Sequence, residues 1–332
     1  MYGQGCEMSV EHYCIPLESP EEWRSALKGI NHTFGHTWEN CYAMYLTTGL
    51  QTYLYSYRND TVRIVCPIAE REFEHHVDIV KPFGFAGFVG TGHAADFSSH
   101  WEEFARERGY VCGYLGLNPL FDFGGLFRAK DVFDYDTIFV LDLTRSIDEL
   151  LAQMHRKRRR ELKQYEDPGS YLVTDKPVLQ EFILEHYADF LLSRNASHYY
   201  SFTKETLSFL LGLDNTILAG ARESGKLVAV AACFYTADSA DGMLYVSLPE
   251  GQHCSAPLFW YTACQAKALG IPSFNFGGGG GGIADFKRRF GCRELPLKCL
   301  KQVYEPAHYE TLCRTVNADP KETAGYFPAY RR

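Results

Sequence analysis

The sequence lacks several features that would place it in a common class of protein. None of its stretches is apolar for the ~18 residues that a membrane-spanning helix needs. Its eleven cysteines are scattered and form no C-x-x-C pair, so we expect free, mostly buried thiols rather than a disulfide framework. Residues 1–10 have neither the basic flank nor the apolar core of a signal peptide. Together these absences predict a soluble, cytoplasmic protein without membrane insertion.

The sequence also lacks an excess of positive charge. Its net charge of −8 argues against a protein that binds nucleic acid over its whole surface, because phosphate binding requires lysine and arginine. A local basic patch is still compatible with this value. The composition, with 46% hydrophobic and 22% charged residues, is globular, and 332 residues predict two domains of roughly 150 residues each.

The first half has the pattern of a mixed α/β domain. We expect helices at 20–27 and 98–107, two strands within 52–68 joined by the turn Asn59-Asp60, and strands at 110–117 and 137–143. Gly84, Gly87, Gly90 and Gly92 indicate either a cluster of turns or a loop where the backbone approaches another group closely. The carboxylates and histidines between 72 and 78 fit no zinc-binding spacing, so we expect a polar surface loop there and no metal site.

A domain boundary is expected near 144–146. Ser146 followed by Glu149 has the spacing of a capping box, which predicts the start of a helix. This helix should continue until Asp167-Pro168-Gly169 and pack by one apolar stripe, which contains Ile147, Leu150, Leu151, Met154 and Leu162. Its other faces carry the basic run 155–160 and Lys163. Such a run is usually a solvated helix face, but consecutive cations repel one another, and a phosphate-bearing substrate would relieve that repulsion.

The second half contains short elements with clear boundaries. In order, we expect a strand at 171–175, helices at 178–194 and 204–213, strands at 217–222, 227–236 and 243–247, a helix at 256–269, a strand at 273–276, a helix at 284–290 and a strand at 295–304. This order, βααβββαβαβ, is similar to that of the GNAT acyltransferase fold.

Two segments resemble the Fem-type (FemAB-like) aminoacyltransferases of the GNAT superfamily. One is the basic helix 154–163, and the other is the run of six glycines, 277–282, followed by Phe286-Lys287-Arg288-Arg289-Phe290-Gly291. The resemblance implies an α/β fold with two GNAT-like domains in tandem. Residues 1–145 would lie on the acceptor side, 146–305 would hold the acyl donor and the catalytic site, and 306–332 would form a tail that packs back on the first domain. No long charged helical hairpin is visible, and the acceptor-binding residues of the first domain cannot be matched.

The resemblance also implies a reaction. Fem-type enzymes move an amino acid from aminoacyl-tRNA, their co-substrate, to an amine of a peptidoglycan precursor, and related enzymes act in peptide-antibiotic pathways. We therefore expect a peptide-bond-forming enzyme whose partners are aminoacyl-tRNA and a small peptide or nucleotide-linked peptide, without a further cofactor. The transfer needs a neutral amine, stabilisation of the tetrahedral oxyanion and a protonated leaving hydroxyl. It needs no covalent nucleophile. Consistently, no G-x-S-x-G motif occurs, and the adjacent His253 and Cys254 should point apart.

The candidate catalytic residues are Lys287, Tyr245, Ser247 and Asp285. Lys287 follows the glycine loop and would stabilise developing negative charge or a tRNA phosphate; the alternative is a surface lysine on a basic turn. Tyr245 and Ser247 are two residues apart on a strand and face the same way, so both hydroxyls could bind the amine or carbonyl, unless Tyr245 is ordinary core. Asp285 could orient Lys287, accept a proton or cap a helix.

The candidate substrate-binding residues are Gly278, Gly279, Gly280, Arg158, Arg159, Phe286, Arg289 and Tyr200. The glycines could form a backbone cradle for an anion, a nucleotide fingerprint or a flexible joint. The cradle is favoured because no Lys-Ser or Lys-Thr follows the glycines and they do not open a βαβ unit. The resemblance aligns Arg159 with the family's phosphate-contacting arginine. Tyr200, like Tyr199, binds substrate or belongs to the core.

Two other functions stay open at this stage. An acyl-coenzyme A donor would need an Arg/Gln-x-x-Gly-x-Gly/Ala loop at the junction 250–257, which here has one glycine, no arginine and a proline. The chain could also keep the fold without the chemistry and act only as a binding protein, because a fold does not guarantee an activity.

Overall fold

The computed structural model describes residues 10–92, 94–121, 125–165, 167–322 and 325–332. The chain forms two compact units, which we describe separately. Unit 1 consists of Met1–Tyr45, Gly49–Tyr135 and Leu297–Arg332, and unit 2 consists of Leu46–Thr48 and Asp136–Pro296. Most of residues 1–10, in which no signal peptide was expected, lie outside the described residues.

The division between the units differs from the expected boundaries at 146 and 305. Apart from Leu46–Thr48, unit 2 begins at Asp136, and the chain returns to unit 1 at Leu297. The physical reason is that two long strands, β7 (Val132–Asp142) and β13 (Arg293–Val303), each run from one unit into the other. In sequence, unit 2 is therefore an insertion within unit 1.

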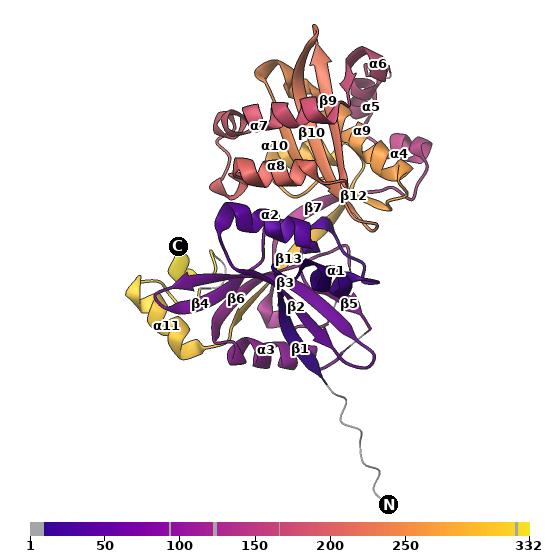
Figure 1. Ribbon diagram of the computed structural model, residues 1–332. Coiled ribbons are helices and arrows are strands. Elements are labelled where there is room, and N and C mark those ends of the chain that lie inside the picture. The colour runs from indigo at the N-terminus through magenta and orange to yellow at the C-terminus, as the bar shows by residue number, and fades with distance from the viewer. Residues whose placement is uncertain (1–9, 93, 122–124, 166, 323–324) are drawn as a thin grey trace, which may run out of the picture. The chain divides into compact units, whose positions relative to one another are not determined.

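Unit 1 is built on a mixed sheet (Figure 1). Its strands are, in spatial order, β1 (Glu11–Pro16), β2 (Thr52–Arg58), β3 (Arg63–Phe73), β4 (His76–Val80), β6 (Tyr110–Leu117) and β13, and β5 (Val89–Thr91) pairs with β3. All neighbours are antiparallel except β4 and β6, which are parallel. In the glycine-rich segment, a Cβ atom at Gly90 would lie 2.0 Å from the Arg63 carbonyl oxygen. The glycines of this segment therefore serve close approach, here of β5 to the backbone of β3.

Helices cover both faces of this sheet. They are α1 (Pro20–Leu27), α2 (Trp38–Thr48), α3 (Phe97–Glu107) and, after β13, α11 (Pro306–Thr315). Because side chains alternate along a strand, Leu54 packs with Trp23 of α1, whereas Tyr55 packs with Trp101 of α3. The helices expected at 20–27 and 98–107 are confirmed. In the part of the chain that the structure describes, the short 3₁₀ segments are Phe34–His36, Ala129–Asp131, η3 (His198–Tyr200), η4 (Pro249–Cys254) and Ala329–Arg331.

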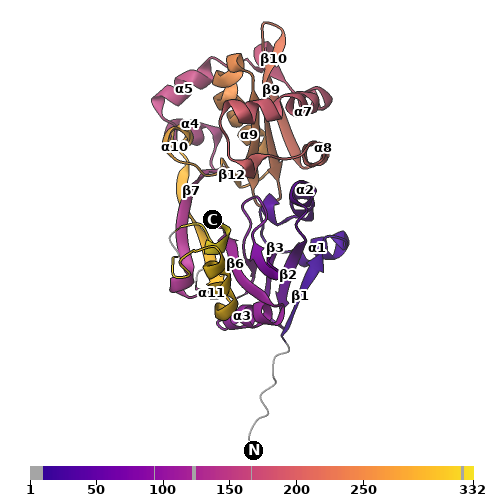
Figure 2. The same ribbon diagram turned by 90° about the vertical axis from the view of Figure 1, so that its left-hand side faces the viewer.

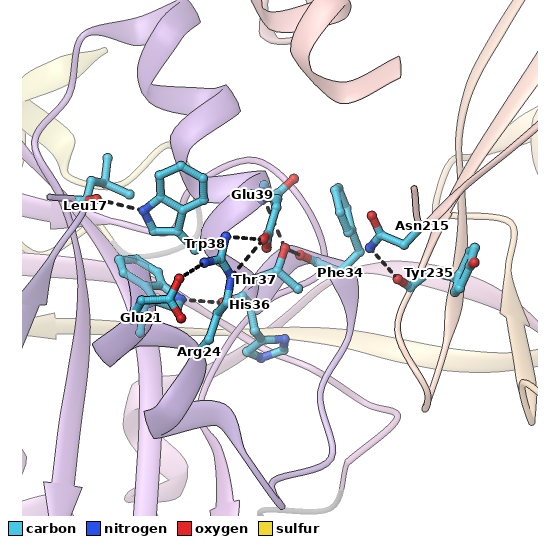
Figure 3. Close-up of polar contacts among 12 residues, drawn as sticks. Leu17, Glu21, Arg24, Phe34, His36, Thr37, Trp38, Glu39, Asn215 and Tyr235 are labelled. Carbon is cyan, nitrogen blue, oxygen red and sulfur yellow. Dashed lines mark hydrogen bonds and ion pairs between the residues drawn. The ribbon is translucent and has the colours of Figure 1, made fainter. Parts of the chain in front are cut away.

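A small polar network joins α1 to α2 (Figure 3). The Arg24 guanidinium binds Glu21 at 2.7 Å and Glu39 at 2.9 Å, and it lies 5.4 Å from the centre of the Trp38 ring. The Trp38 indole N–H donates to the Leu17 carbonyl at 2.7 Å. The ion pairs are partly exposed and each contributes at most about 1 kcal/mol, so the network orients the helices more than it stabilises them.

The segment 72–78 is a surface loop only at its tip, where Glu74 and His75 are exposed. It forms the tight hairpin between β3 and β4, and Glu74 and His75 adopt positive φ. Asp78 is buried between Arg71, at 2.7 Å, and Arg331, at 2.6 Å. The polar residues of this segment are therefore explained by a hairpin turn and by an ion-paired carboxylate that anchors the C-terminal residues.

Unit 2 repeats the strand arrangement of unit 1. In spatial order its strands are β8 (Leu172–Val173), β9 (Thr216–Glu223), β10 (Lys226–Tyr235), β11 (Ala240–Ser247), β12 (Ser273–Asn275) and β7. Again only one pair is parallel, here β11 with β12. In each unit the strand beyond the parallel pair comes from elsewhere in the chain, namely β13 in unit 1 and β7 in unit 2. The expected α/β class is confirmed.

Helices also cover both faces of the unit 2 sheet (Figure 2). They are α4 (Ile147–Gln153), α5 (Arg156–Lys163), α6 (Pro168–Tyr171), α7 (Lys176–Ser193), α8 (Lys204–Gly212), α9 (Ser255–Ala268) and α10 (Gly281–Arg288). No helix in the described ranges is both long and apolar enough to cross a membrane. The ten cysteines that the structure describes are free and mostly buried, as expected.

Candidate active site

The glycine loop starts where two parallel strands separate. The ladder between β11 and β12 has two residue pairs, Ala240 with Phe274 and Asp241 with Asn275. At the second pair, the buried Asn275 amide group donates to Asp241 at 2.9 Å, and its carbonyl oxygen accepts from the Gly277 amide at 2.8 Å. The Asn275 side chain thus fixes the first residue of the loop at the point where β11 and β12 diverge.

The loop presents unpaired amides at the start of a helix. In the described part of the chain, no hydrogen bond is donated by the amides of Gly278, Gly279, Gly280, Gly281 and Gly282. Gly280 is the N-cap of α10, so the helix begins earlier than the expected residue 284. A Cβ atom at Gly278 would lie 2.5 Å from a carboxylate oxygen of Asp136, so a side chain there would displace this carboxylate. Free amides at a helix N-terminus bind anions, so this loop can serve as the predicted anion cradle.

Lys287 lies beneath this loop. Its side chain is half-buried, and its ammonium group donates to the Gly278 carbonyl oxygen at 2.5 Å. Because a trans peptide unit directs its C=O and N–H to opposite sides, the Gly279 amide points away from Lys287. Burial lowers the pKa of Lys287 to about 8, against the opposing effect of the Asp136 carboxylate. Lys287 is therefore neither a surface lysine nor a member of a structural ion pair.

Two further side chains lie around the loop. Asp136, an exposed residue of β7, accepts a hydrogen bond from the Thr137 amide at 2.7 Å. Burial, Tyr199 and the Asp136 carboxylate raise the pKa of Tyr200, so the Tyr200 phenol is within electrostatic range of Asp136. Asp136 thus lies beside the glycine loop, and Lys287 and Tyr200 are within electrostatic range of it.

Asp136 is the residue that sequence reasoning missed. It directly precedes the strand expected at 137–143, but no motif marks it. Its importance depends on the pairing of β7 with β12, where Val140 lies opposite Asn275 at the start of the glycine loop. A pairing between strands so far apart in sequence leaves no local signal.

The basic segment is two helices rather than one. The capping box of Ser146 and Glu149 is confirmed, but α4 ends at Gln153. Met154 and His155 are extended, and the His155 side chain accepts from the Lys157 amide at 3.2 Å, which starts α5. No glycine or proline marks this break. It turns α5 so that Arg158, one of the cations expected to bind phosphate, points inward.

Arg158 is buried, with 1% of its side chain exposed, so it cannot contact a substrate phosphate. Its guanidinium binds Glu161 at 2.7 Å and donates to the Phe286 carbonyl at 3.0 Å. It also lies 4.4 Å and 4.3 Å from the ring centres of Phe286 and Phe290. The prediction of a substrate-binding Arg158 is wrong, because this guanidinium joins α5 to α10, the helix that carries Lys287.

Contacts explain the residue types of the segment 286–291, which has the pattern F-K-x-x-F-G. Phe286 and Phe290 enclose the Arg158 guanidinium. Gly291 has a φ of 77°, and a Cβ atom there would lie 2.9 Å from the Gln153 carbonyl oxygen at the end of α4. These residues position α10, while Lys287 reaches the glycine loop. Phe286 is thus a packing residue of the described structure, and its proposed contact with substrate remains a prediction.

The other cations of α5 are exposed. Arg156, Lys157, Arg160 and Lys163 point to solvent. Arg159 is also exposed, and it donates to the Ala152 carbonyl at 2.9 Å near the end of α4. We refer to these five residues as the basic face of α5. Arg289 is half-buried, and its role in substrate binding stays a prediction.

Tyr245 and Ser247 lie on β11 beyond its pairing with β12. The Tyr245 hydroxyl donates to the Gly251 carbonyl at 2.8 Å, and its ring stacks on Phe259. Burial raises the pKa of Tyr245, which the buried Ser247 hydroxyl opposes. Asp285 is exposed and pairs with Arg288 at 3.3 Å rather than with Lys287. The catalytic roles expected for these three residues remain predictions.

His253 and Cys254 do not point apart as the sequence analysis expected. The distance between the Cys254 sulfur and His253 Nε2 is 3.6 Å. The expectation assumed a strand or an α-helix, whereas the two residues lie in the 3₁₀ segment η4.

Known structures share this fold. No protein-family profile and no curated protein sequence matches the chain. FemX is similar with a TM-score of 0.68 and 10% identity over 92% of this chain and 99% of FemX. The C-terminal domain of a putative lysylphosphatidylglycerol synthetase from Agrobacterium fabrum gives 0.58 and 16% over 90% and 96% of the two chains. L-PGS from Bacillus licheniformis gives 0.51 and 15% over 85% and 91%. The chain therefore has the fold of FemX, as the resemblance to Fem-type enzymes predicted.

Proposed function

We propose that the protein is an aminoacyltransferase that moves an aminoacyl group from aminoacyl-tRNA to the amine of a small peptide or nucleotide-linked peptide. The observation that carries the proposal is that five loop amides without hydrogen-bond acceptors lie next to a half-buried lysine, Lys287, which binds the same loop. Amides held in place before the reaction stabilise a tetrahedral oxyanion without reorganisation. The fold shared with FemX supports the same reaction class.

The proposed chemistry proceeds without a covalent enzyme intermediate. The acceptor amine attacks the ester carbonyl, and the amides of the loop bind the oxyanion that forms. The positive charge of Lys287 stabilises the same anion through the Gly278–Gly279 peptide. Asp136 is exposed beside the loop and accepts the proton that the amine loses. Collapse of the intermediate forms the amide bond and breaks the ester bond, and the proton taken up by Asp136 passes to the departing ribose oxygen, which leaves as the ribose hydroxyl of the tRNA.

An acyl-coenzyme A donor is disfavoured by the structure of η4. In GNAT enzymes that use this donor, free amides in the loop that corresponds to the junction between β11 and α9 bind the pyrophosphate. Here the Gly251 amide donates to the Leu248 carbonyl at 3.0 Å, and a Cβ atom on Gly251 would lie 2.3 Å from the Val228 carbonyl oxygen. Glu250 belongs to η4, and Glu223 contacts His253 of η4 at 2.6 Å. Both carboxylates would repel a pyrophosphate.

The donor can be tested directly with the purified protein. Charged tRNA bearing a labelled amino acid and labelled acetyl-coenzyme A are supplied in separate reactions with a mixture of peptide amines. We expect label transfer or accelerated ester hydrolysis from the tRNA only. Transfer from acetyl-coenzyme A would replace the donor, and binding without turnover of either would support a binding protein.

The activity should depend on pH through Lys287. Its pKa is lowered to about 8, so the cation is present below that pH and is lost above it. If the cation stabilises the oxyanion, kcat/KM should fall as pH rises above about 8. In Lys287→Arg the guanidinium cannot be deprotonated in this range, so whatever activity remains should lack this descending limb. A limb that persists in Lys287→Arg would assign it to another group.

The basic face of α5 should bind the tRNA backbone. We expect Arg156→Ala combined with Lys157→Ala to weaken tRNA binding and to lower the slope of log K against log salt by about 2, if each residue contacts one phosphate. Arg314→Ala, which removes an exposed cation from unit 1, is the matched control and should leave the slope unchanged. An equal slope in all three proteins would make the basic face a solvated surface.

A further inference from the structure

Three side chains of the kinds that bind metal ions converge at one end of the unit 2 sheet. They are not part of the glycine loop or of the surroundings of Lys287. Glu223 is the last residue of β9, and His253 and Cys254 end the 3₁₀ segment η4. Their ligand atoms all lie within 4.8 Å of one another. The residues come from two separate segments, β9 and η4, so the cluster has no sequence motif by which it could be recognised.

The contacts exclude a catalytic relay. In a Cys-His-carboxylate triad, the two ring nitrogens of the histidine face different partners. Here a single nitrogen, Nε2 of His253, is 3.6 Å from the Cys254 sulfur and 2.6 Å from a carboxylate oxygen of Glu223. One thiol, one imidazole nitrogen and one carboxylate oxygen therefore converge on a common point, which is the arrangement of ligands around a cation.

The distances fit a tetrahedral zinc ion. With Zn–S and Zn–N bonds of about 2.3 and 2.05 Å, tetrahedral geometry separates sulfur and nitrogen by about 3.6 Å. The observed separation of Cys254 and His253 is 3.6 Å. The same geometry places the carboxylate oxygen about 3.4 Å from the nitrogen and about 3.6 Å from the sulfur. Glu223 now lies 2.6 Å from the nitrogen and within 4.8 Å of the sulfur, so its carboxylate would move by roughly 1 Å. Its side chain is 41% exposed, which allows this movement.

The charges and accessibility of the cluster fit the same ion. A thiolate and a carboxylate together balance the two positive charges of Zn²⁺. Cys254 is buried, whereas the His253 and Glu223 side chains are 51% and 41% exposed, so an ion can reach the sulfur from solvent past two polar ligands. Three protein ligands leave the fourth tetrahedral position to water or a substrate group, as in zinc sites that are not purely structural.

We propose that Glu223, His253 and Cys254 form a zinc-binding site that anchors η4 to the end of β9. Binding replaces the proton of the Cys254 thiol with the metal, and that proton passes to solvent. The Tyr245 hydroxyl of β11 already donates to the Gly251 carbonyl of η4. An ion bound by His253 and Cys254 would therefore hold η4 more firmly against β11 as well. The proposal does not depend on the aminoacyltransferase function.

The test uses the full-length protein after removal of metal with a chelator. Zn²⁺ is titrated in competition with a chromogenic chelator, and Co²⁺ is used as a spectroscopic substitute. We expect one tightly bound Zn²⁺ per chain, a thiolate-to-cobalt charge-transfer band in the near ultraviolet, and a melting temperature that rises by several degrees with Zn²⁺. Absence of saturable Zn²⁺ binding by the wild-type protein would overturn the proposal.

Variants locate the ion. Cys254→Ser should abolish the charge-transfer band and weaken Zn²⁺ binding at least tenfold, and the more exposed Glu223→Gln should weaken it without affecting the fold. Cys264→Ser, which removes a half-buried thiol from α9, is the matched control and should bind as the wild type does. Circular dichroism of each metal-free variant checks the fold. A band that persists in Cys254→Ser, or that disappears in Cys264→Ser, would place the ion elsewhere and contradict the proposed site.

Discussion

Replacing Lys287 with methionine is expected to lower turnover about hundredfold and to leave the protein folded. The methionine keeps most of the buried aliphatic stem but removes the hydrogen bond to the Gly278 carbonyl and the positive charge beneath the loop. One preorganised contact to an oxyanion contributes roughly 3 kcal/mol to the stabilisation of the transition state. The measurement is kcat under single-turnover conditions with charged tRNA, alongside circular dichroism.

The matched control for this experiment is Arg288→Met. Arg288 is the next residue of the same helix, but its guanidinium is exposed and pairs with Glu294 at 2.8 Å. Its loss should change turnover by less than about twofold. If Lys287→Met retained near-normal turnover, Lys287 would have no part in the mechanism. If both variants lost activity equally, the effect would belong to α10 as a whole rather than to the ammonium group.

Replacing Arg158 with methionine is expected to reduce the free energy of unfolding by about 3 kcal/mol. The substitution removes a charged hydrogen bond to the partly exposed Glu161 carboxylate, leaves the Phe286 carbonyl without its partner, and removes the cation from between two aromatic rings. Arg158 also fixes α10 against α5, so turnover should fall together with stability. Denaturant unfolding followed by circular dichroism measures the first effect.

Arg159→Met provides the comparison at the neighbouring position. This exposed arginine donates to the Ala152 carbonyl, and its loss should cost at most about 1 kcal/mol. The two variants make the same chemical change one residue apart, so the difference between them isolates burial. Equal stability of the two variants would show that Arg158 does not join the helices.

Local signals predicted local structure well. The capping box of Ser146 and Glu149 is formed as expected, because its two hydrogen bonds depend only on residues three apart. The glycine loop and the lysine that follows it were likewise recognisable, since the chain needs glycine where the backbone adopts positive φ, as at Gly279. The spacing of apolar residues also predicted much of the order of helices and strands in the second half of the chain.

Long-range contacts explain what sequence reasoning missed. Arg158 lies four residues before Leu162 and so shares its buried helix face, but only the distant Phe286 and Phe290 rings explain how an arginine is accommodated there, while Arg159 is exposed. Asp136 acquires its place only because β7 pairs with β12. The cluster of Glu223 and His253 likewise depends on where the sheet brings the end of β9. Each of these depends on contacts between residues distant in the chain.

The insertion of unit 2 within unit 1 sets an order of events during translation. Residues 298–303 of β13 pair with 112–117 of β6, and they are synthesised only after the residues of unit 2. At the ~5–20 residues per second of synthesis, the edge of β6 waits on the order of ten seconds or more for its partner. The nascent chain therefore carries an incomplete first sheet while unit 2 has all its strands, and it is in this interval that the protein depends most on protection from aggregation.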